Sequence, residues 1–410
     1  MDYYQMKNMN LIDNGRKSWE WATSHMRIMG AIVNQHVNDK PLSGLRLGLS
    51  LHITKETSVL VTAAIELGAK VSLCSANPLS VRDDIVAFLS SCGVKVYAWK
   101  DETEREYYDN LKQVLENNPH IVTDDGANLH VMAHKNKTFG ILGGTEETTS
   151  GITRLKALEK EGKLRYPVIG VNEAHTKHLF DNRYGTGQST LTGIIKLTNV
   201  LIAGKHIVIF GYGNVGRGVA TRARGMGAIV TIVEVDPLKA LEAYMDGYGV
   251  KKIDQVVQNA DIFITCTGQK NVISEKHFKK MKSGALLTNA GHFDNEIEVE
   301  KLFSNSYEHY SIKQYLDCFN INGRRIILLA KGRVVNLVAG EGNPPEVMAM
   351  SFANQLLSIL HIFQHHKRMQ KKVFSVPEKI DNNVARLSLK YLHISIDKLN
   401  AVQRKYAQSY

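Results

Sequence analysis

The stretch HIVIFGYGNVGRG, residues 206–218, is the most informative part of this sequence. Its β-branched run at 207–209 predicts a buried strand that leads into a glycine-rich turn and then a helix. Gly211 permits the tight turn, Gly213 lets the backbone approach a pyrophosphate, and Gly216 lets the helix pack on the strand. This order of strand, turn and helix forms the dinucleotide fingerprint and predicts a dinucleotide site.

An acidic residue follows the fingerprint at the distance expected for such a site. The segment AIVTIV, residues 228–233, predicts a second strand, and Glu234 follows it. A carboxylate there accepts hydrogen bonds from a ribose 2′-hydroxyl and repels a 2′-phosphate. We therefore expect NAD rather than NADP as the cofactor, held by Gly211, Gly213, Asn214, Val215, Gly216 and Glu234.

Length and composition limit the class of protein. A chain of 410 residues exceeds one hydrophobic core, so two or more domains are expected. No apolar run reaches the roughly 18 residues of a membrane span, and the N-terminus lacks the apolar core of a signal peptide. The four cysteines lack metal-ligand spacing, which favours reduced thiols. We expect a cytoplasmic protein with no membrane contact and no metal.

The net charge of +11 has a local component, the basic cluster HHKRMQKK at 365–372. No module that mixes aromatic and basic residues accompanies it, as a nucleic-acid binder would require. A solvated helix end or a subunit contact is therefore the favoured interpretation, and no nucleic-acid partner is expected.

Strand-like and helix-like segments alternate twice along the chain, first from residue 46 and again from residue 206. This alternation predicts an α/β fold with two doubly wound, Rossmann-like parallel sheets, the NAD-binding domain being inserted into the substrate domain. The expected parts are a first substrate-binding segment, the NAD-binding domain, a return segment and a C-terminal oligomerisation segment, at 1–183, 184–336, 337–370 and 371–410. Ligands are expected in the cleft between the two sheets, at the carboxyl ends of the strands.

Seven separated motifs occur in one order: HITKET (52–57), TDDGANL (123–129), TEETTSG (145–151), AHTKHLFDN (174–182), GYGNVGRG (211–218), NAGHFDNEIE (289–298) and GRVVNL (332–337). Together they resemble the S-adenosyl-L-homocysteine hydrolase family, from about residue 12 to about residue 406. The segment FDNRYGTGQST is similar to the shorter branch of the family, found in archaea and thermophilic bacteria.

The resemblance implies a hydrolase that needs NAD. Oxidation of the 3′-hydroxyl of a nucleoside thioether to a ketone makes the C4′ hydrogen acidic, so that homocysteine can leave by elimination. Water then adds, and the hydride returns to C3′. By this resemblance, Lys177 and Asp181 match the pair of residues at the 3′-hydroxyl, and Asn182 orients Lys177. Glu147 matches the carboxylate that binds the ribose hydroxyls. A lysine beside the positive nicotinamide is expected to have a lowered pKa.

The resemblance also assigns an acid–base group around C4′ and C5′, formed by His52, Asp125 and His292. Which of them performs each proton transfer stays open. Taken singly, these residues have ordinary structural explanations, such as a core histidine or an Asx turn at Asp124 and Asp125. Their joint occurrence with the fingerprint favours a catalytic site.

Further residues are assigned to binding by the same resemblance. Thr54, Glu56 and Thr57 match the wall around adenine, where a carboxylate at Glu56 suits the 6-amino group. Asn343 and Met348 complete the expected substrate side. The groups expected to reach NAD from outside the glycine turn are Thr148, Thr149, Ser150, Asn289, Gly291 and Asn336.

The chain departs from the family pattern at the substrate mouth and at the C-terminus. Gly342-Asn343-Pro344 stands where the family has Gly-His-Pro, which makes the preference for adenine less secure. The C-terminal KYAQSY stops before the Lys- and Tyr-bearing tail that reaches a neighbouring subunit's NAD, so weaker NAD retention is expected. The family implies a homo-oligomer, with a tetramer as the better expectation.

The leading hypothesis is reversible hydrolysis of S-adenosyl-L-homocysteine to adenosine and L-homocysteine. Two alternatives stay open. Asn343 motivates a related nucleoside thioether, such as S-inosylhomocysteine or a specialised-metabolite nucleoside, whereas Glu56 argues against the inosyl compound. An NAD-binding regulator without turnover is disfavoured because the chain keeps the elimination residues.

Overall fold

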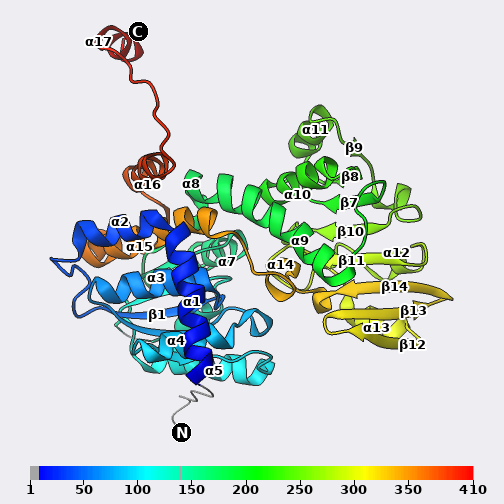
Figure 1. Ribbon diagram of the computed structural model, residues 1–410, viewed down its shortest axis with the longest axis horizontal. Coiled ribbons are helices and arrows are strands. Elements are labelled where there is room, and N and C mark those ends of the chain that lie inside the picture. Colours follow the sequence, from blue (N-terminus) through cyan, green and yellow to red (C-terminus); the bar gives the residue numbers. More distant parts are fainter. Residues whose placement is uncertain (1–8, 139, 410) are drawn as a thin grey trace.

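The protein is described by a computed structural model that covers residues 9–138 and 140–409. Two lobes lie side by side, one drawn in blue and cyan and the other in green and yellow, and each is built around one sheet (Figure 1). The α/β class with two Rossmann-like units is confirmed.

The first lobe contains a seven-stranded sheet in the order β15-β6-β5-β4-β1-β2-β3, in which every paired neighbour is parallel. Its strands are β1 (Arg46–Leu51), β2 (Lys70–Ser75), β3 (Lys95–Tyr97), β4 (Ile121–Asp124), β5 (Gly143–Glu146), β6 (Val168–Gly170) and β15 (Val373–Ser375). Its helices are α1 (Met9–His25), α2 (Arg27–His36), α3 (Lys55–Glu66), α4 (Asp83–Ser91), α5 (Glu104–Glu116), α6 (Asn128–Lys135), α7 (Thr149–Lys160), α8 (His175–Lys177), α15 (Pro345–His365) and α16 (Glu378–Tyr391).

The second lobe contains an eight-stranded sheet in the order β12-β13-β14-β11-β10-β7-β8-β9. Its strands are β7 (His206–Phe210), β8 (Ile229–Val233), β9 (Gly249–Val250), β10 (Ile262–Thr265), β11 (Ala285–Asn289), β12 (Glu308–Lys313), β13 (Leu316–Ile321) and β14 (Arg324–Leu329). Its helices are α9 (Thr186–Thr198), α10 (Asn214–Gly225), α11 (Pro237–Met245), α12 (Glu275–Phe278), α13 (Val299–Asn305) and α14 (Val335–Val338).

The second sheet corrects the prediction of a purely parallel arrangement. β12, β13 and β14 are antiparallel neighbours at one edge, whereas the remaining pairs are parallel. Asn322 and Gly323 join β13 to β14, and both have a positive φ, of 52° and 77°. An Asn-Gly pair of this kind matches the twist of a tight hairpin, so the local signal for the antiparallel edge was present in the sequence.

Helix α15 returns the chain from the second lobe to the first, where it packs in the core against α2, α3 and α16. Together with its extension to Arg368 it is long and apolar enough to span a membrane, but 61% of its apolar window is buried inside the protein. Burial of this kind is typical of a core helix. The basic cluster at 365–372 lies at its largely exposed C-terminal end.

The chain leaves the first lobe after α16 as an extended arm that ends in α17 (Ala401–Ala407), the red helix that projects away from both lobes (Figure 1). Six large apolar side chains on this arm are exposed, those of Leu392, Ile394, Ile396, Leu399, Val402 and Tyr406. The arm contributes to neither hydrophobic core of the two lobes.

Candidate active site

Residues that follow three different strands meet between the two lobes. Asp125 follows β4 and lies between His52, which follows β1, and His292, which follows β11 of the second lobe. Asp125 Oδ2 is 3.3 Å from His52 Nε2, and Asp125 Oδ1 is 3.4 Å from His292 Nδ1. One carboxylate therefore contacts an imidazole from each lobe.

The close contact of His292 with the first lobe depends on a glycine. A Cβ at Gly126 would lie 2.3 Å from His292 Nε2, and the φ of Gly126 is +105°. Both the space and the backbone conformation therefore exclude a side chain at this position. The sequence TDDG thus fixes how closely the second lobe approaches Asp125.

His52 is held as a neutral imidazole. Burial lowers the pKa of His52 to about 4, although the charge of Asp125 opposes this shift. Its Nδ1 lies 2.6 Å from the hydroxyl of Ser80, a contact that sequence reasoning missed. At neutral pH the ring is therefore available as a base.

A second charged cluster is formed by Lys177 of α8. Its Nζ is 2.8 Å from Asp181 Oδ2 and 3.4 Å from Glu147 Oε1, and it donates a hydrogen bond to Asn182 Oδ1 at 2.9 Å. Asp181 and Asn182 lie on η3 (His178–Gly185), a widened π-helical stretch that continues α8. Such local widening is frequent at functional sites.

The lowered pKa predicted for Lys177 depends on the positive charge of a neighbouring nicotinamide, so it stays a prediction. Burial alone would lower the pKa of Lys177, but the charges of Asp181 and Glu147 outweigh burial and raise it above its ordinary value. Burial raises the pKa of Glu147 to about 7, although Lys177 opposes this shift. The cluster therefore contains one firmly held ammonium and one carboxyl group that titrates near neutral pH.

Helix α15 contributes polar side chains to this cluster that sequence reasoning missed. Ser351 Oγ donates to Asp181 Oδ2 at 3.0 Å, and Gln355 Nε2 donates to Glu147 Oε2 at 2.6 Å. Polar residues at 351, 354, 355 and 358 interrupt the apolar run of α15, and all are buried. A buried polar stripe on an apolar helix was the available signal.

The amide of Asn343 is hydrogen-bonded within the protein at both ends. Its amide nitrogen donates to Asp181 Oδ1, and to Thr186 Oγ1 at 3.1 Å. Its oxygen accepts from Ser189 Oγ at 2.8 Å and from Asn336 Nδ2 at 3.1 Å. Both ends of the amide are thus bound within the protein, and the place of Asn343 beside the base stays a prediction.

Two of the side chains expected around the base make hydrogen bonds to the nearby backbone. Thr54 caps α3 by accepting from the backbone N–H of Thr57, and the Thr57 hydroxyl donates to the carbonyl of His52 at 2.5 Å. Glu56 is 1% exposed, and burial raises the pKa of its carboxyl group. Met348 packs against the first core.

The glycine turn fits a dinucleotide. Gly211 has a φ of +92°, and a Cβ at Gly216 would lie 2.0 Å from the carbonyl oxygen of Gly211. A Cβ at Gly213 would meet nothing within 4 Å, which leaves open space beside the first N–H groups of α10, at Asn214 and Val215. Those groups suit a pyrophosphate.

The acidic residue after β8 lies beside this turn. Glu234 Oε2 accepts from the backbone N–H of Tyr212 at 2.6 Å, and Glu234 Oε1 accepts from that of Val235 at 2.7 Å. The carboxylate is thereby fixed at the rim of the turn, as a ribose hydroxyl would require.

The groups expected to reach NAD from the first lobe lie at the start of α7. Thr148 occupies the N-cap position without a capping hydrogen bond from its side chain, and Thr149 Oγ1 accepts from Asn172 Nδ2 at 2.7 Å. The buried hydroxyl of Ser150 has no hydrogen-bond partner among the described residues.

Asn289 has a structural role that the resemblance did not imply. Its amide nitrogen donates to three backbone carbonyls, including that of Phe293 at 2.8 Å, and its oxygen accepts from Gly291 N–H at 2.7 Å. The amide therefore shapes the loop that carries His292, and the expected contact of Asn289 with NAD stays a prediction. Asn336 also donates to Ser189 Oγ at 3.1 Å, and its buried oxygen has no partner in the described chain.

Comparisons with known proteins agree with this geometry. A family model described as S-adenosyl-L-homocysteine hydrolase matches residues 3–140, and that of its NAD-binding domain matches residues 182–342. The adenosylhomocysteinase of Sulfolobus acidocaldarius is 50% identical over 99% of both chains. The chain belongs to the S-adenosyl-L-homocysteine hydrolase family.

Family members with two different names are similar to this chain. The S-inosyl-L-homocysteine hydrolase of Methanocaldococcus jannaschii is 46% identical over 99% of both chains. Among solved structures, a dipicolinate synthase chain from Bacillus halodurans is 13% identical, with a TM-score of 0.47 over 80% of this chain and 99% of that one. Membership of the hydrolase family confirms the expected NAD cofactor and the expected enzyme class.

Proposed function

We propose that the protein hydrolyses S-adenosyl-L-homocysteine reversibly to adenosine and L-homocysteine, using bound NAD. The observation that supports this most strongly is the meeting of two charged clusters, around Lys177 and around Asp125, in a chain that also carries a dinucleotide turn. An alcohol dehydrogenase needs one such cluster, whereas oxidation followed by elimination needs both. When bound, NAD takes the hydride from C3′ and returns it at the end of the cycle.

We assign the Lys177 cluster to the 3′-hydroxyl. The cluster holds two carboxylates and one ammonium, so it can take up the hydroxyl proton during oxidation and return it later. Glu147, with a pKa of about 7, is the member that gains a proton most readily near neutral pH. Asn182 and Asp181 hold the lysine in place.

We assign the acid–base work at C4′ and C5′ to His52, Asp125 and His292. Their ligating atoms lie within 4.8 Å of one another, close enough to exchange a proton through one substrate or water oxygen. The neutral state of His52 suits removal of the C4′ proton, and the proton so gained can then be given to the departing thiolate.

The identity of the base has two candidates. Glu56 favours adenine, because an ionised carboxylate accepts from the 6-amino group. The rival is hypoxanthine, and the specific observation in its favour is that burial raises the pKa of Glu56, since a protonated carboxyl can donate to a 6-carbonyl. The curated relatives include enzymes named for each substrate.

The test is thiol release by the NAD-loaded enzyme from the adenosyl and inosyl thioethers in parallel. Faster release from the adenosyl compound supports the main proposal, and faster release from the inosyl compound supports the rival. Absence of thiol from both, despite bound NAD, would refute the proposed activity.

We further propose a cytoplasmic homotetramer, with parts at 1–183, 184–336, 337–370 and 371–410. The packing of α15 in the first core supports assigning the return segment to the substrate domain. The exposed apolar side chains of the C-terminal arm support its role in subunit contact. Sedimentation of the full chain tests the tetramer, and a monomer at working concentration would contradict it.

A further inference from the structure

Lys55 is the first residue of α3 and directly precedes Glu56, the carboxylate that the proposed function assigns to the base. Its Nζ is 3.2 Å from Glu56 Oε1 and 3.2 Å from Glu341 Oε2. Lys55 therefore contacts one carboxylate of its own helix and one of the segment that follows α14. Its charge affects these two carboxylates to different extents.

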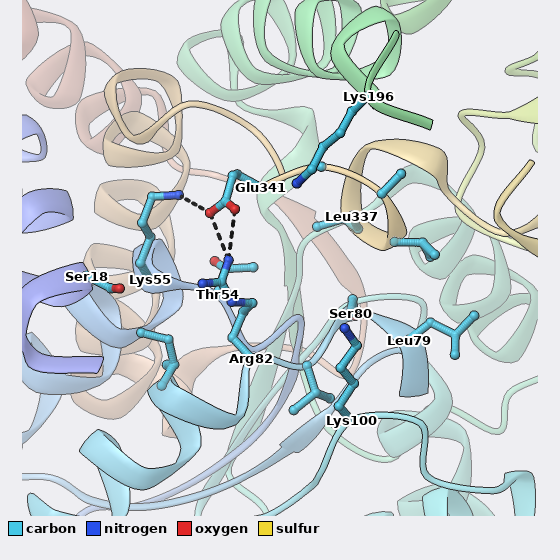
Figure 2. Close-up of a pocket in the computed structure, with 15 residues that line it drawn as sticks. Ser18, Thr54, Lys55, Leu79, Ser80, Arg82, Lys100, Lys196, Leu337 and Glu341 are labelled. Carbon is cyan, nitrogen blue, oxygen red and sulfur yellow. Dashed lines mark hydrogen bonds and ion pairs between the residues drawn. The ribbon is translucent and has the colours of Figure 1, made fainter. Parts of the chain in front are cut away.

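Glu341 has a second cationic partner. Arg82 Nη1 donates to both oxygens of Glu341, at 3.0 and 2.9 Å, and Figure 2 shows the Lys55 and Arg82 side chains meeting at this carboxylate. The side chain of Glu341 is also 55% exposed, so water screens its charge. Loss of Lys55 would therefore leave Glu341 paired and hydrated.

Glu56 is in a different position. Its side chain is almost fully buried, and its Oε1 accepts no hydrogen bond from the residues that the structure describes. Lys55 lies within ion-pair distance of this oxygen, which keeps an acceptor position for a ligand. Because a buried pair of charges is screened less than an exposed one, Lys55 acts more strongly on Glu56 than on Glu341.

Burial and Lys55 have opposite effects on the charge of Glu56. Burial raises the pKa of Glu56, and the charge of Lys55 opposes that rise. Removal of the ammonium would therefore shift Glu56 toward its neutral form.

The charge of Glu56 decides which bases it can bind. An ionised carboxylate only accepts hydrogen bonds, so it binds a 6-amino group and repels a 6-carbonyl oxygen. A neutral carboxyl group both donates and accepts, so it can bind either. Discrimination between the two bases thus requires the ionised form.

We propose that Lys55 is a specificity-determining residue, whose ammonium keeps Glu56 ionised and so makes the site prefer a 6-amino base to a 6-oxo base. The inference rests on the proposed function, and it names a residue that sets the choice between the two candidate substrates. Lys55 acts through Glu56 and needs no contact with the base itself.

The test is the ratio of kcat/KM for the adenosyl thioether to kcat/KM for the inosyl thioether, measured as thiol release by the NAD-loaded enzyme. Lys55→Met should lower this ratio about tenfold, whereas Lys55→Arg keeps the charge and should stay within about threefold of wild type. Glu341→Gln is the matched control, because it removes the other carboxylate that Lys55 contacts, and its ratio should also stay within about threefold of wild type. An unchanged ratio in Lys55→Met would overturn the inference, as would an equal fall in Lys55→Arg or in Glu341→Gln.

A double-variant cycle tests whether Lys55 acts through Glu56. In the Glu56→Gln background the side chain at 56 cannot ionise, so Lys55→Met should leave the ratio unchanged. An equal fall in both backgrounds would overturn the inference, because Lys55 would then act on the base directly.

Binding measurements test Lys55 separately from the reaction. 3′-Deoxyadenosine and 3′-deoxyinosine lack the hydroxyl that is oxidised, so calorimetry with the NAD-loaded protein gives their Kd values without turnover. Lys55→Met should shift the ratio of these Kd values toward 3′-deoxyinosine, and an unshifted ratio would overturn the inference. Absence of thiol from both thioethers with wild type would refute the proposed function, whereas the Kd ratio would still decide the role of Lys55.

Discussion

The amide of Asn343 donates a hydrogen bond to the carboxylate of Asp181. This contact joins the segment before α15 to the lysine–aspartate pair on η3, which lies more than 150 residues earlier in the chain. Asp181 also accepts from Ser351 and pairs with Lys177, so its two oxygens are fixed by three side chains. The residue that departs from the family pattern thus directly contacts the cluster that we propose for the 3′-hydroxyl.

Asn343→Ala should slow reduction of bound NAD by adenosine about tenfold, because loss of one charge-assisted hydrogen bond leaves Asp181 free to turn away from Lys177. Stopped-flow absorbance of the reduced nicotinamide measures this rate. Thr186→Val is the control. The Thr186 hydroxyl contacts Asn343, and the bond from the Thr186 backbone N–H to the Asp181 carbonyl is kept in this variant, so it should have a smaller effect. An unchanged reduction rate with an altered preference between adenine and hypoxanthine would instead place Asn343 at the base.

Lys177→Met should abolish reduction of bound NAD by adenosine while the circular dichroism spectrum stays that of wild type. The variant removes the only ammonium that contacts both Glu147 and Asp181 within the described residues. Two buried carboxylates without a counter-charge should also lower the free energy of unfolding by about 3–5 kcal/mol above neutral pH. Normal formation of reduced nicotinamide would refute the role given to Lys177.

Glu147→Gln should flatten the dependence of stability on pH. The pKa of Glu147 in the folded protein is about 7, above the ordinary value of 4.5. The folded protein therefore binds the carboxyl proton more tightly than the unfolded chain does. This adds to the free energy of unfolding in full below about pH 4.5, and the addition is lost as pH rises through 7. Between about pH 5 and pH 8 wild type should therefore lose up to about 3 kcal/mol that the variant keeps. Urea unfolding at about pH 5 and about pH 8 measures the free energy of unfolding of both proteins. An equal decrease in wild type and in the variant would contradict the prediction.

Gly216→Ala should lower the stability of the dinucleotide domain, whereas Gly213→Ala should weaken its binding of NAD. A Cβ at 216 would meet the Gly211 carbonyl at 2.0 Å, so α10 must shift, at a cost of about 1–3 kcal/mol. A Cβ at 213 meets open space, so the variant should keep the melting temperature of the NAD-free protein but bind NAD more weakly. Thermal unfolding and calorimetry separate the two cases. Equal NAD affinity in Gly213→Ala and wild type would exclude a pyrophosphate at this turn.

Much of the fold was predictable because its signals are local. The β-branched run at 207–209 and the glycines after it are consecutive in sequence, and they form the strand and turn that their spacing predicts. The antiparallel edge at β12–β14 departs from the alternation of strands and helices, and its local signal was the Asn322–Gly323 turn.

The sequence indicated which residues to assign to the site, but it did not predict the distances between their side chains. Placement after neighbouring parallel strands brings His52 and Asp125 together, because the carboxyl ends of such strands share one edge of a sheet. His292 follows a strand of the second sheet and joins them through the packing of the two lobes. By contrast, the raised pKa of Lys177 follows from two carboxylates that lie within 3.4 Å of it only after folding. Sequence spacing carries no information about such distances between remote segments.

The polar stripe of α15 has a consequence for how the protein is made. Ser351 and Gln355 contact Asp181 and Glu147, yet they lie beyond the whole second lobe in the chain. A ribosome-bound chain that has already exposed the whole second sheet and β1 to β6 of the first, but not this helix, cannot assemble the hydroxyl cluster. Competence for the reaction should therefore appear late and abruptly during synthesis, after the dinucleotide turn has been complete for more than a hundred residues.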